Sequence, residues 1–215
     1  MIPNWAAERQ RMVETQLRRR GIHNPRVLAA MGAIPREEFV PLEWRVTAYG
    51  DSPVAIGYGQ TISQPYMTAL MAAEMELDGS ETVLEVGAGC GYAAAVLGAL
   101  AKRVIALEII PELAGAARHN LQRTGCDSNV EVIATDGSLG FAAYAPYDAI
   151  SVAAGAPSVP PALLEQLRDP GRLVIPVGAL EDQELLVVTR KGGQTGTRVA
   201  AMCRFVPLRG GEGWA

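Results

Sequence analysis

The segment that most restricts the fold is an apolar strand that runs directly into a loop of alternating glycines. Its sequence is Val83-Leu84-Glu85-Val86-Gly87-Ala88-Gly89-Cys90-Gly91-Tyr92. Glycine adopts positive φ without strain and has no Cβ, so a ligand can approach the backbone of such a loop closely. A helix that begins at Tyr92 would add unpaired N–H donors at its N-terminus. Strand, glycine loop and helix in this order predict a nucleotide-type cofactor at the end of a parallel strand.

Apolar strand patterns and helical patterns alternate through the rest of the chain. The expected strands are Thr82 to Val86, Val104 to Leu107, Val130 to Ala134, Ala149 to Val152 and Arg172 to Val177. The expected helices between them are Tyr92 to Ala101, Pro111 to Arg123 and Pro160 to Leu167. Strands that are almost continuously apolar are typical of a parallel sheet buried on both faces. The alternation therefore predicts an α/β fold with helices on both faces of the sheet.

The two ends of the chain have a different character. Glu8 to Arg20 has the pattern of an amphipathic helix that ends at Gly21, and Pro25 can open a second helix through Ala33. Near the C-terminus, Leu185 to Thr189 and Val199 to Phe205 flank a Gly192-Gly193 turn with no helix between them, which indicates antiparallel strands at a sheet edge. We expect residues 1–79 to form a helical segment packed on a cofactor-binding domain of residues 80–215.

The loop spacing allows two cofactors but favours one of them. In a dinucleotide-binding G-x-G-x-x-G pattern counted from Gly87, the third glycine would fall on Tyr92; counted from Gly89, the permitted alanine falls on Ala94. The dinucleotide alternative therefore stays open. Glu85, just before the glycines, is a poor neighbour for a pyrophosphate and a suitable one for the ammonium and sulfonium charges of S-adenosylmethionine.

Two acidic residues follow the next strands. Glu108 closes the second strand about twenty residues after the glycines, where a carboxylate can accept hydrogen bonds from both ribose hydroxyls. Asp136-Gly137 follows the third strand and could meet the adenine edge, with the carboxylate accepting from the exocyclic amine. On spacing alone, solvated loop carboxylates explain both residues equally well.

Composition restricts the compartment and the partners. The chain has 215 residues, of which 49% are hydrophobic and 20% charged, with a net charge of −4. This charge disfavours a nucleic-acid or membrane partner. No signal peptide or apolar run of about 20 residues is evident, so we expect a cytoplasmic protein. With no interface signature in the sequence, we expect a monomer.

The cysteines and histidines do not form a metal-binding pattern. Cys90, Cys126 and Cys203 are widely separated and match no C-x-x-C spacing, and only His23 and His119 accompany them. Reduced, partly buried thiols are the simpler interpretation. We therefore expect no metal site.

Several segments together resemble the protein-L-isoaspartate O-methyltransferase family over nearly the whole chain. The most specific is Gly59-Gln60-Thr61-Ile62-Ser63-Gln64-Pro65, which is similar to the family's active-site signature and lies upstream of the cofactor loop, as in the family. The other matching segments are Met12 to Ile22, Val27 to Met31, Pro35 to Pro41, Ala145 to Asp148, Pro160 to Leu163, Gly171 to Gly178 and Phe205 to Leu208.

The resemblance implies a Rossmann-like S-adenosylmethionine methyltransferase sheet with an N-terminal helical segment. It implies methyl transfer from S-adenosylmethionine to the free carboxylate of isoaspartyl residues in damaged proteins and peptides, leaving S-adenosylhomocysteine. Ser63 would be the active-site hydroxyl, with Gln60 and Thr61 as further candidates for positioning the substrate. The cofactor-binding residues would be Glu85, Gly87, Gly89 and Gly91 for the methionyl part and loop, Glu108 for the ribose, and Asp136 with Gly137 for the adenine.

The chain departs from the family pattern in three places. Ala88 and Cys90 stand where family members often have hydroxyl residues, and Gly155 interrupts the small-residue run from Ala153 to Pro157. These changes could alter cofactor affinity. None of them removes a group that the chemistry requires.

The implied reaction does not need a general base, because a carboxylate with a pKa near 4 is already ionised at neutral pH. Ser63 could orient this carboxylate by donating one hydrogen bond. Taken alone, however, a serine two residues before a proline is more often a helix cap or turn residue. The alternatives are a relative that methylates aspartates in one dedicated peptide or another small carboxylate, a nicotinamide-dependent oxidoreductase, and a non-catalytic S-adenosylmethionine-binding protein that recognises altered proteins.

Some prominent apolar residues are better explained by packing than by the site. Helical spacing relates Met67, Leu70, Met71 and Met75, which we expect in the core rather than in a substrate pocket. We likewise expect Trp5, Trp44 and Trp214 to be packing residues.

Overall fold

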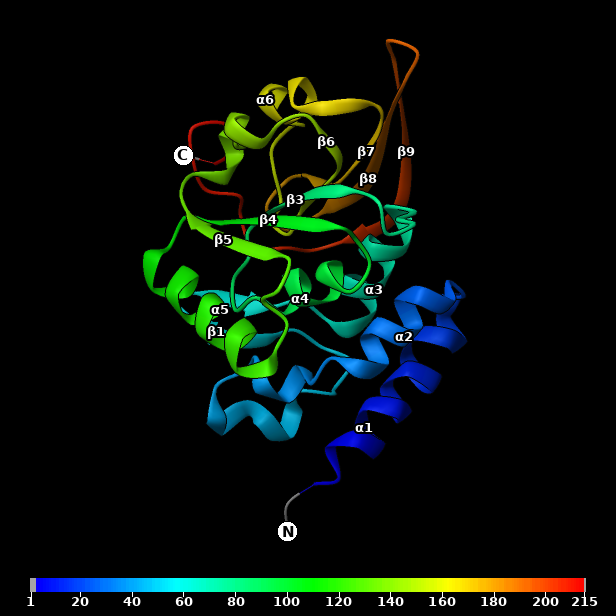
Figure 1. The fold of residues 1–215 in the computed structure, drawn as a ribbon, viewed down its shortest axis with the longest axis vertical. Helices are drawn as coiled ribbons and strands as arrows, with labels where there is room; N and C mark the ends of the chain where they lie inside the picture. Colours follow the sequence, from blue (N-terminus) through cyan, green and yellow to red (C-terminus); the bar gives the residue numbers. More distant parts are fainter. Residues whose placement is uncertain (1–2, 215) are drawn as a thin grey trace.

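A seven-stranded sheet forms the centre of the computed structural model, which describes residues 3–214 (Figure 1). Its strands are β3 (Thr82–Val86), β4 (Arg103–Glu108), β5 (Val130–Ala134), β6 (Tyr147–Val152), β7 (Leu167–Gly178), β8 (Gln183–Lys191) and β9 (Gln194–Cys203). Their order across the sheet is β5-β4-β3-β6-β7-β8-β9. The first five strands in this order are parallel, and β8 and β9 are antiparallel. The predicted α/β class and its antiparallel C-terminal strands are confirmed.

Both faces of the sheet are buried, which explains why its strands are apolar along their whole length. On β3, Val83 belongs to one core cluster and Leu84 to the other, and both side chains are fully buried. One face carries α3 (Pro65–Glu74), α4 (Tyr92–Gly98) and α5 (Pro111–Thr124), and the other carries the short α6 (Pro161–Glu165) (Figure 1). Helices therefore cover both faces, but unequally.

The N-terminal segment packs on the same face as α3 and α4. The expected helix over Glu8 to Arg20 is a continuous helical stretch of three kinds: α1 (Trp5–Met12), a π-helical turn (Val13–Leu17) and a 3-10 turn (Arg18–Arg20). Gly21 ends it with a φ of 93°, as predicted. The second helix, α2 (Pro25–Ala33), has the predicted bounds. Buried side chains of this segment join the core cluster that contains Val83.

The residues that precede α3 form a hairpin that the sequence did not predict. After two 3-10 segments (Arg36–Glu38 and Leu42–Thr47), β1 (Val54–Gly57) pairs antiparallel with β2 (Gln60–Ile62). The turn is tight, since Tyr58 and Gly59 both have positive φ, 55° and 71°. The hairpin delivers the chain to Ser63, and Pro65 then opens α3.

The expected packing residues have mixed outcomes. Met71 and Met75 are buried, whereas Met67 packs against the core and also lines the cleft described below. Trp5 packs against Tyr49, and the Trp214 indole donates a hydrogen bond to a backbone carbonyl. The prediction for Trp44 is wrong: this side chain is 47% exposed, because the 3-10 segment Leu42–Thr47 has no buried residue.

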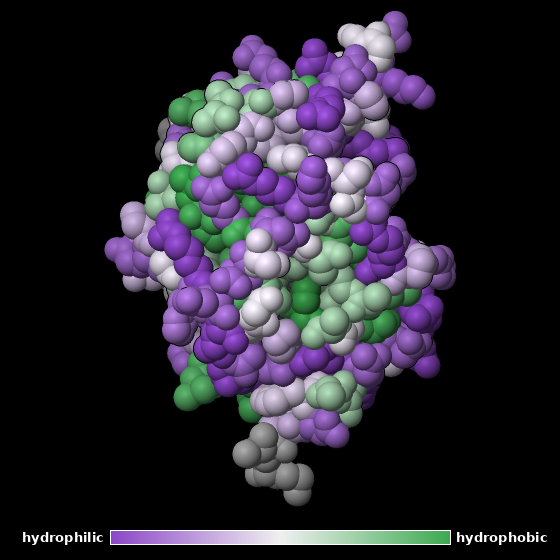
Figure 2. Space-filling view, in the orientation of Figure 1, coloured by the Kyte–Doolittle hydropathy of each residue, from purple (hydrophilic) through white to green (hydrophobic). Residues whose placement is uncertain are grey.

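The surface of the face seen in Figure 2 is largely hydrophilic, with apolar side chains gathered around its middle. Within residues 3–214, no helix combines the length and the apolar character needed to cross a membrane. The same residues contain no group of three or more His, Cys, Asp or Glu side chains that could hold a metal ion.

Candidate active site

A cleft opens where the parallel strands end. Its nucleotide end is lined by the loop after β3, the end of β4, Gly137 after β5 and Ala153 after β6. Because the carboxyl ends of parallel strands meet at one sheet edge, four separate loops converge here. The acceptor end is a second cavity, and its lining includes Ser63 and Ala153. Thr61 and Ala153 line both cavities, so the two ends are adjacent.

The first two glycines of the loop form the floor of the cleft. Gly87 and Gly89 line it with φ of 89° and 54°, a conformation that other residues adopt only with strain. Gly91 differs, because it is absent from the described cleft lining and a Cβ on it would lie 3.2 Å from Ala117 of α5. The third glycine therefore allows close helix packing, and its predicted cofactor contact has no support from this geometry.

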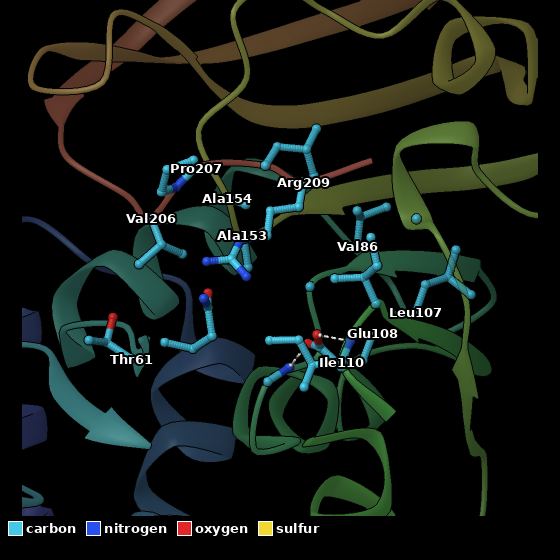
Figure 3. Close-up of a pocket in the computed structure, with 16 residues that line it drawn as sticks. Thr61, Val86, Leu107, Glu108, Ile110, Ala153, Ala154, Val206, Pro207 and Arg209 are labelled. Carbon is cyan, nitrogen blue, oxygen red and sulfur yellow. Dashed lines mark hydrogen bonds between the residues drawn. The ribbon is translucent and has the colours of Figure 1, made fainter. Parts of the chain in front are cut away.

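Glu108 holds the glycine loop in place. The Gly89 N–H donates to its Oε2 at 2.7 Å and the Ile110 N–H donates to its Oε1 at 2.9 Å (Figure 3). Each carboxylate oxygen can accept about two hydrogen bonds, so one position on each remains for a ligand hydroxyl. The carboxylate lines the nucleotide end, where the predicted ribose contact requires it.

Glu85 is a carboxylate with no partner. Its side chain is fully buried, and neither of its oxygens has a hydrogen-bond partner within residues 3–214. Burial, and secondarily the negative charge of Glu108, raise the pKa of Glu85 to about 8. A buried charge without a partner is costly, so the carboxyl is mostly protonated at neutral pH and would ionise only beside a positively charged group. The ammonium and sulfonium groups of S-adenosylmethionine meet this requirement. Glu85 lines none of the cleft cavities itself and lies beneath the glycine loop that does.

We expect Glu85→Gln to stabilise the cofactor-free protein at pH 9 by about 1–3 kcal/mol, because it removes an unpaired buried charge. The folded-state pKa of about 8 lies above the ordinary value of 4.5. The folded protein therefore retains a proton that the unfolded chain releases, and stability falls as the pH rises between these values. Thermal unfolding of both proteins at pH 5 and pH 9 measures this. A difference of equal size at both pH values would contradict the interpretation.

Asp136 is engaged by the C-terminal segment. The Ser138 N–H and hydroxyl donate to its Oδ1 at 2.9 and 2.7 Å, and the Gly211 N–H donates to its Oδ2 at 2.7 Å. Burial raises the pKa of Asp136, but these hydrogen bonds outweigh it and leave the pKa below its ordinary value. About one of four acceptor positions stays free for an adenine amine. Gly137 lines the nucleotide end, and Asp136 does not.

Ser63 lies half-buried between β2 and α3, at the acceptor end of the cleft. It does not cap α3, because Gln64 occupies the N-cap position and no side chain caps the helix. Within residues 3–214 the Ser63 hydroxyl has no hydrogen-bond partner, so it is available to a ligand. One small cavity is lined by Ser63 together with Gly87, Gly89 and Ala153. The structure thus brings the predicted acceptor hydroxyl to the cofactor loop.

The two other candidates from the signature lie toward the cofactor. Thr61 lines both ends of the cleft, whereas Gln60 lines the nucleotide end. The geometry therefore supports a substrate-positioning role for Thr61 more than for Gln60.

The acceptor end is large and nearly charge-balanced. Its volume of about 930 Å³ is at the upper end of the range for ligand pockets. Two cations at its rim are each paired with a carboxylate: Arg20 with Asp51 at 3.0 Å, and Arg204 with Glu181 at 2.7 Å. Arg20 also lies 3.6 Å above the ring of Tyr66. The cavity has room for an extended peptide residue with its neighbours and imposes no single charge.

Sequence reasoning missed the residues that follow β9. Val206 and Pro207 line both ends of the cleft, and Figure 3 shows the Arg209 guanidinium inside the nucleotide end beside Ala153. This end measures only about 60 Å³, less than a nucleoside needs. We expect the exposed Arg209 side chain to move aside when a nucleoside binds. No spacing rule indicates these residues, because they reach the cleft by tertiary packing.

Cys90 does not act as a nucleophile in this geometry. The thiol is buried, and burial raises its pKa to about 11. A thiol with this pKa is protonated at neutral pH, and the thiolate is the reactive form. Cys90 is therefore not the nucleophile of this cleft.

Comparison with known proteins agrees with this geometry. A family model described as "Protein-L-isoaspartate(D-aspartate) O-methyltransferase (PCMT)" matches residues 7–213. A protein-L-isoaspartate O-methyltransferase from Koribacter versatilis is 49% identical over 100% of this chain and 96% of its own, and protein-L-isoaspartate O-methyltransferase 2 from Marinobacter nauticus is 54% identical over 96% and 94%.

Solved structures give the same result. One protein-L-isoaspartate O-methyltransferase structure superimposes with a TM-score of 0.83 and 29% identity, covering 95% of this chain and 66% of its own. A Plasmodium falciparum structure, described as a protein-L-isoaspartate O-methyltransferase in complex with S-adenosyl-L-homocysteine, has a TM-score of 0.78 and 27% identity over 94% of this chain and 98% of its own.

Proposed function

The chain belongs to the protein-L-isoaspartate(D-aspartate) O-methyltransferase family, and we propose that it methylates the free carboxylate of isoaspartyl residues in damaged proteins and peptides, which initiates their repair. It is an enzyme, and its cofactor is S-adenosylmethionine. The observation that carries the proposal is the cavity that Ser63 shares with Gly87 and Gly89, because it puts an unpartnered hydroxyl beside the cofactor loop.

When bound, S-adenosylmethionine supplies an electrophilic methyl group on a sulfonium centre. The residues of the chain need only hold an ionised carboxylate against it, since a carboxylate requires no general base at neutral pH. Ser63 would donate one hydrogen bond to this carboxylate and add no competing charge. Alignment of the reacting atoms is worth about 7–11 kcal/mol in favourable systems, so positioning can supply much of the catalysis.

We assign the remaining roles from the geometry of the cleft. Glu85 would accept from the ammonium of the methionyl part, Glu108 from the ribose hydroxyls, and Asp136 from the adenine amine, with Gly137 giving room for the ring. Residues 1–79 would then carry the acceptor hydroxyl, and residues 80–215 would bind the cofactor.

Transfer of a labelled methyl group to an isoaspartyl peptide tests the function. With tritiated S-adenosylmethionine, we expect label in an isoaspartyl peptide and about 100-fold less in the same peptide with normal aspartate. The free carboxylate of normal aspartate is on the side chain, so it would be displaced from the reacting position. Equal labelling of both peptides would contradict isoaspartyl specificity. No labelling of either peptide, with intact cofactor binding, would favour a non-catalytic binding protein.

We further propose that damaged proteins and peptides are the partners of this enzyme and that it acts as a cytoplasmic monomer. The net charge of −4 supports a protein substrate over nucleic acid. Gel filtration with light scattering would measure the mass of the particle. A mass of twice the chain or more would contradict the monomer.

A further inference from the structure

A fully buried arginine is hydrogen-bonded to the main chain of the residue that carries the proposed acceptor hydroxyl. Arg36 belongs to the 3-10 segment before the hairpin, and its side chain is 0% exposed. Its Nε donates to the Ala48 carbonyl at 2.7 Å, and its Nη2 donates to the Ser63 carbonyl at 2.8 Å. The guanidinium thus holds the main chain at the residue whose side chain lines the cleft.

The same guanidinium also reaches the cofactor side. It lies 4.9 Å from the centre of the Tyr92 ring, within the range of a cation–π contact. Tyr92 is the first residue of α4, immediately after the glycine loop. Arg36 therefore contacts the two segments that must be aligned for methyl transfer.

Core packing alone does not explain a charge at this position. The carboxylate next to it in the sequence, Glu37, is engaged elsewhere: it accepts hydrogen bonds from Arg9 and Tyr49. The Arg36 Nη1 is buried without a partner within residues 3–214. A buried cation with no carboxylate partner is costly, and an apolar residue of similar volume would often stabilise a protein more.

We propose that Arg36 is a positioning residue for methyl transfer. It fixes the main chain of Ser63 relative to the cofactor loop, so that the hydroxyl holds the acceptor carboxylate in line with the methyl group. This inference rests on the proposed function of Ser63 and adds a second residue to the same site. The two carbonyl bonds need the planar fork of a guanidinium, which a single lysine ammonium cannot reproduce.

Kinetics of Arg36→Met and Arg36→Lys test the proposal. We expect kcat to fall about 30- to 100-fold in both variants, because a shift of about 1 Å at a reacting group can cost that much. We expect the Kd of S-adenosylhomocysteine to stay within about threefold of wild type, since loss of orientation alone does not remove a cofactor contact. The same titration with S-adenosylhomocysteine gives the fraction of protein that is folded and binds the cofactor. Each kcat is divided by this fraction.

Arg26→Met is the matched control. Arg26 also bridges two backbone carbonyls, those of Leu77 and Leu100, at 2.6 and 2.7 Å, and it lines none of the cleft cavities described above. We expect Arg26→Met to lower the thermal midpoint while keeping kcat within about twofold of wild type. An equal loss of kcat in Arg26→Met and Arg36→Met would show that Arg36 has only a structural role.

A double-mutant cycle with Ser63→Ala separates positioning from general damage. If Arg36 acts through Ser63, Arg36→Lys should reduce kcat little further once the hydroxyl is gone, because effects of residues that act as a unit are not additive. Fully multiplicative losses, or an Arg36→Lys variant with wild-type kcat, would overturn the proposal. Failure of the wild-type enzyme to label an isoaspartyl peptide would instead refute the proposed function.

Discussion

Replacing Ser63 by alanine is expected to lower kcat for methylation of an isoaspartyl peptide about 100-fold or more, because misplacement of a reacting group by about 1 Å can cost this much. The hydroxyl lines the small cavity that also contains Gly87 and Gly89, and it does not cap α3. We expect S-adenosylmethionine affinity to change less than about threefold, since the hydroxyl serves the acceptor and not the cofactor. Initial rates and equilibrium binding on the same preparation measure both quantities.

The control for this variant is Ser158→Ala. Ser158 is exposed and lines neither end of the cleft, so its removal should change neither rate nor affinity. A wild-type rate in Ser63→Ala would remove Ser63 from the site. A parallel loss of cofactor affinity would assign the hydroxyl to the cofactor instead.

Replacing Glu108 by alanine is expected to weaken S-adenosylmethionine binding by about 100-fold or more. The carboxylate accepts from the backbone of Gly89 and Ile110 and faces the nucleotide end. Its loss removes the two proposed hydrogen bonds from the ribose hydroxyls to a charged acceptor, at about 1.5–3 kcal/mol each, and releases the Gly89 and Ile110 N–H groups that hold the loop. Since 1.4 kcal/mol corresponds to tenfold in affinity, the total exceeds about 100-fold.

Isothermal titration calorimetry measures this effect, with Glu131→Ala as the control. Glu131 is an exposed residue of β5 that pairs with Arg103 outside the cleft, so its removal should leave affinity unchanged. At saturating cofactor, Glu108→Ala should recover a large part of the wild-type rate. Wild-type affinity in Glu108→Ala would refute the ribose contact and the role of Glu108 in holding the loop.

The parallel sheet could be predicted because its signals are local. β3 and β5 have the expected bounds, since short runs rich in valine and other β-branched or apolar residues are typical of strands. The glycine loop also follows from sequence, but only its first two glycines line the cleft. The role of Gly91 depends on Ala117, a residue of another helix that no local pattern reveals.

The acceptor side of the cleft could not be predicted from local sequence patterns. The hairpin of β1 and β2 requires positive φ at Tyr58, a residue that rarely adopts it, so its turn is not evident in the sequence. An arginine is ordinarily expected at the surface, and Arg36 is buried because residues distant in the sequence pack around it. Arg209 reaches the cleft from the far end of the chain. Only the resemblance to a known family indicated Ser63.

A crystal structure of the protein with S-adenosylhomocysteine and an isoaspartyl peptide tests the central claim most directly. We expect the nucleoside between Glu108 and Gly137, the sulfur beside Gly87 and Ala153, and the free isoaspartyl carboxylate within about 3 Å of the Ser63 hydroxyl. A carboxylate bound away from Ser63, or a nucleoside outside this cleft, would contradict the account.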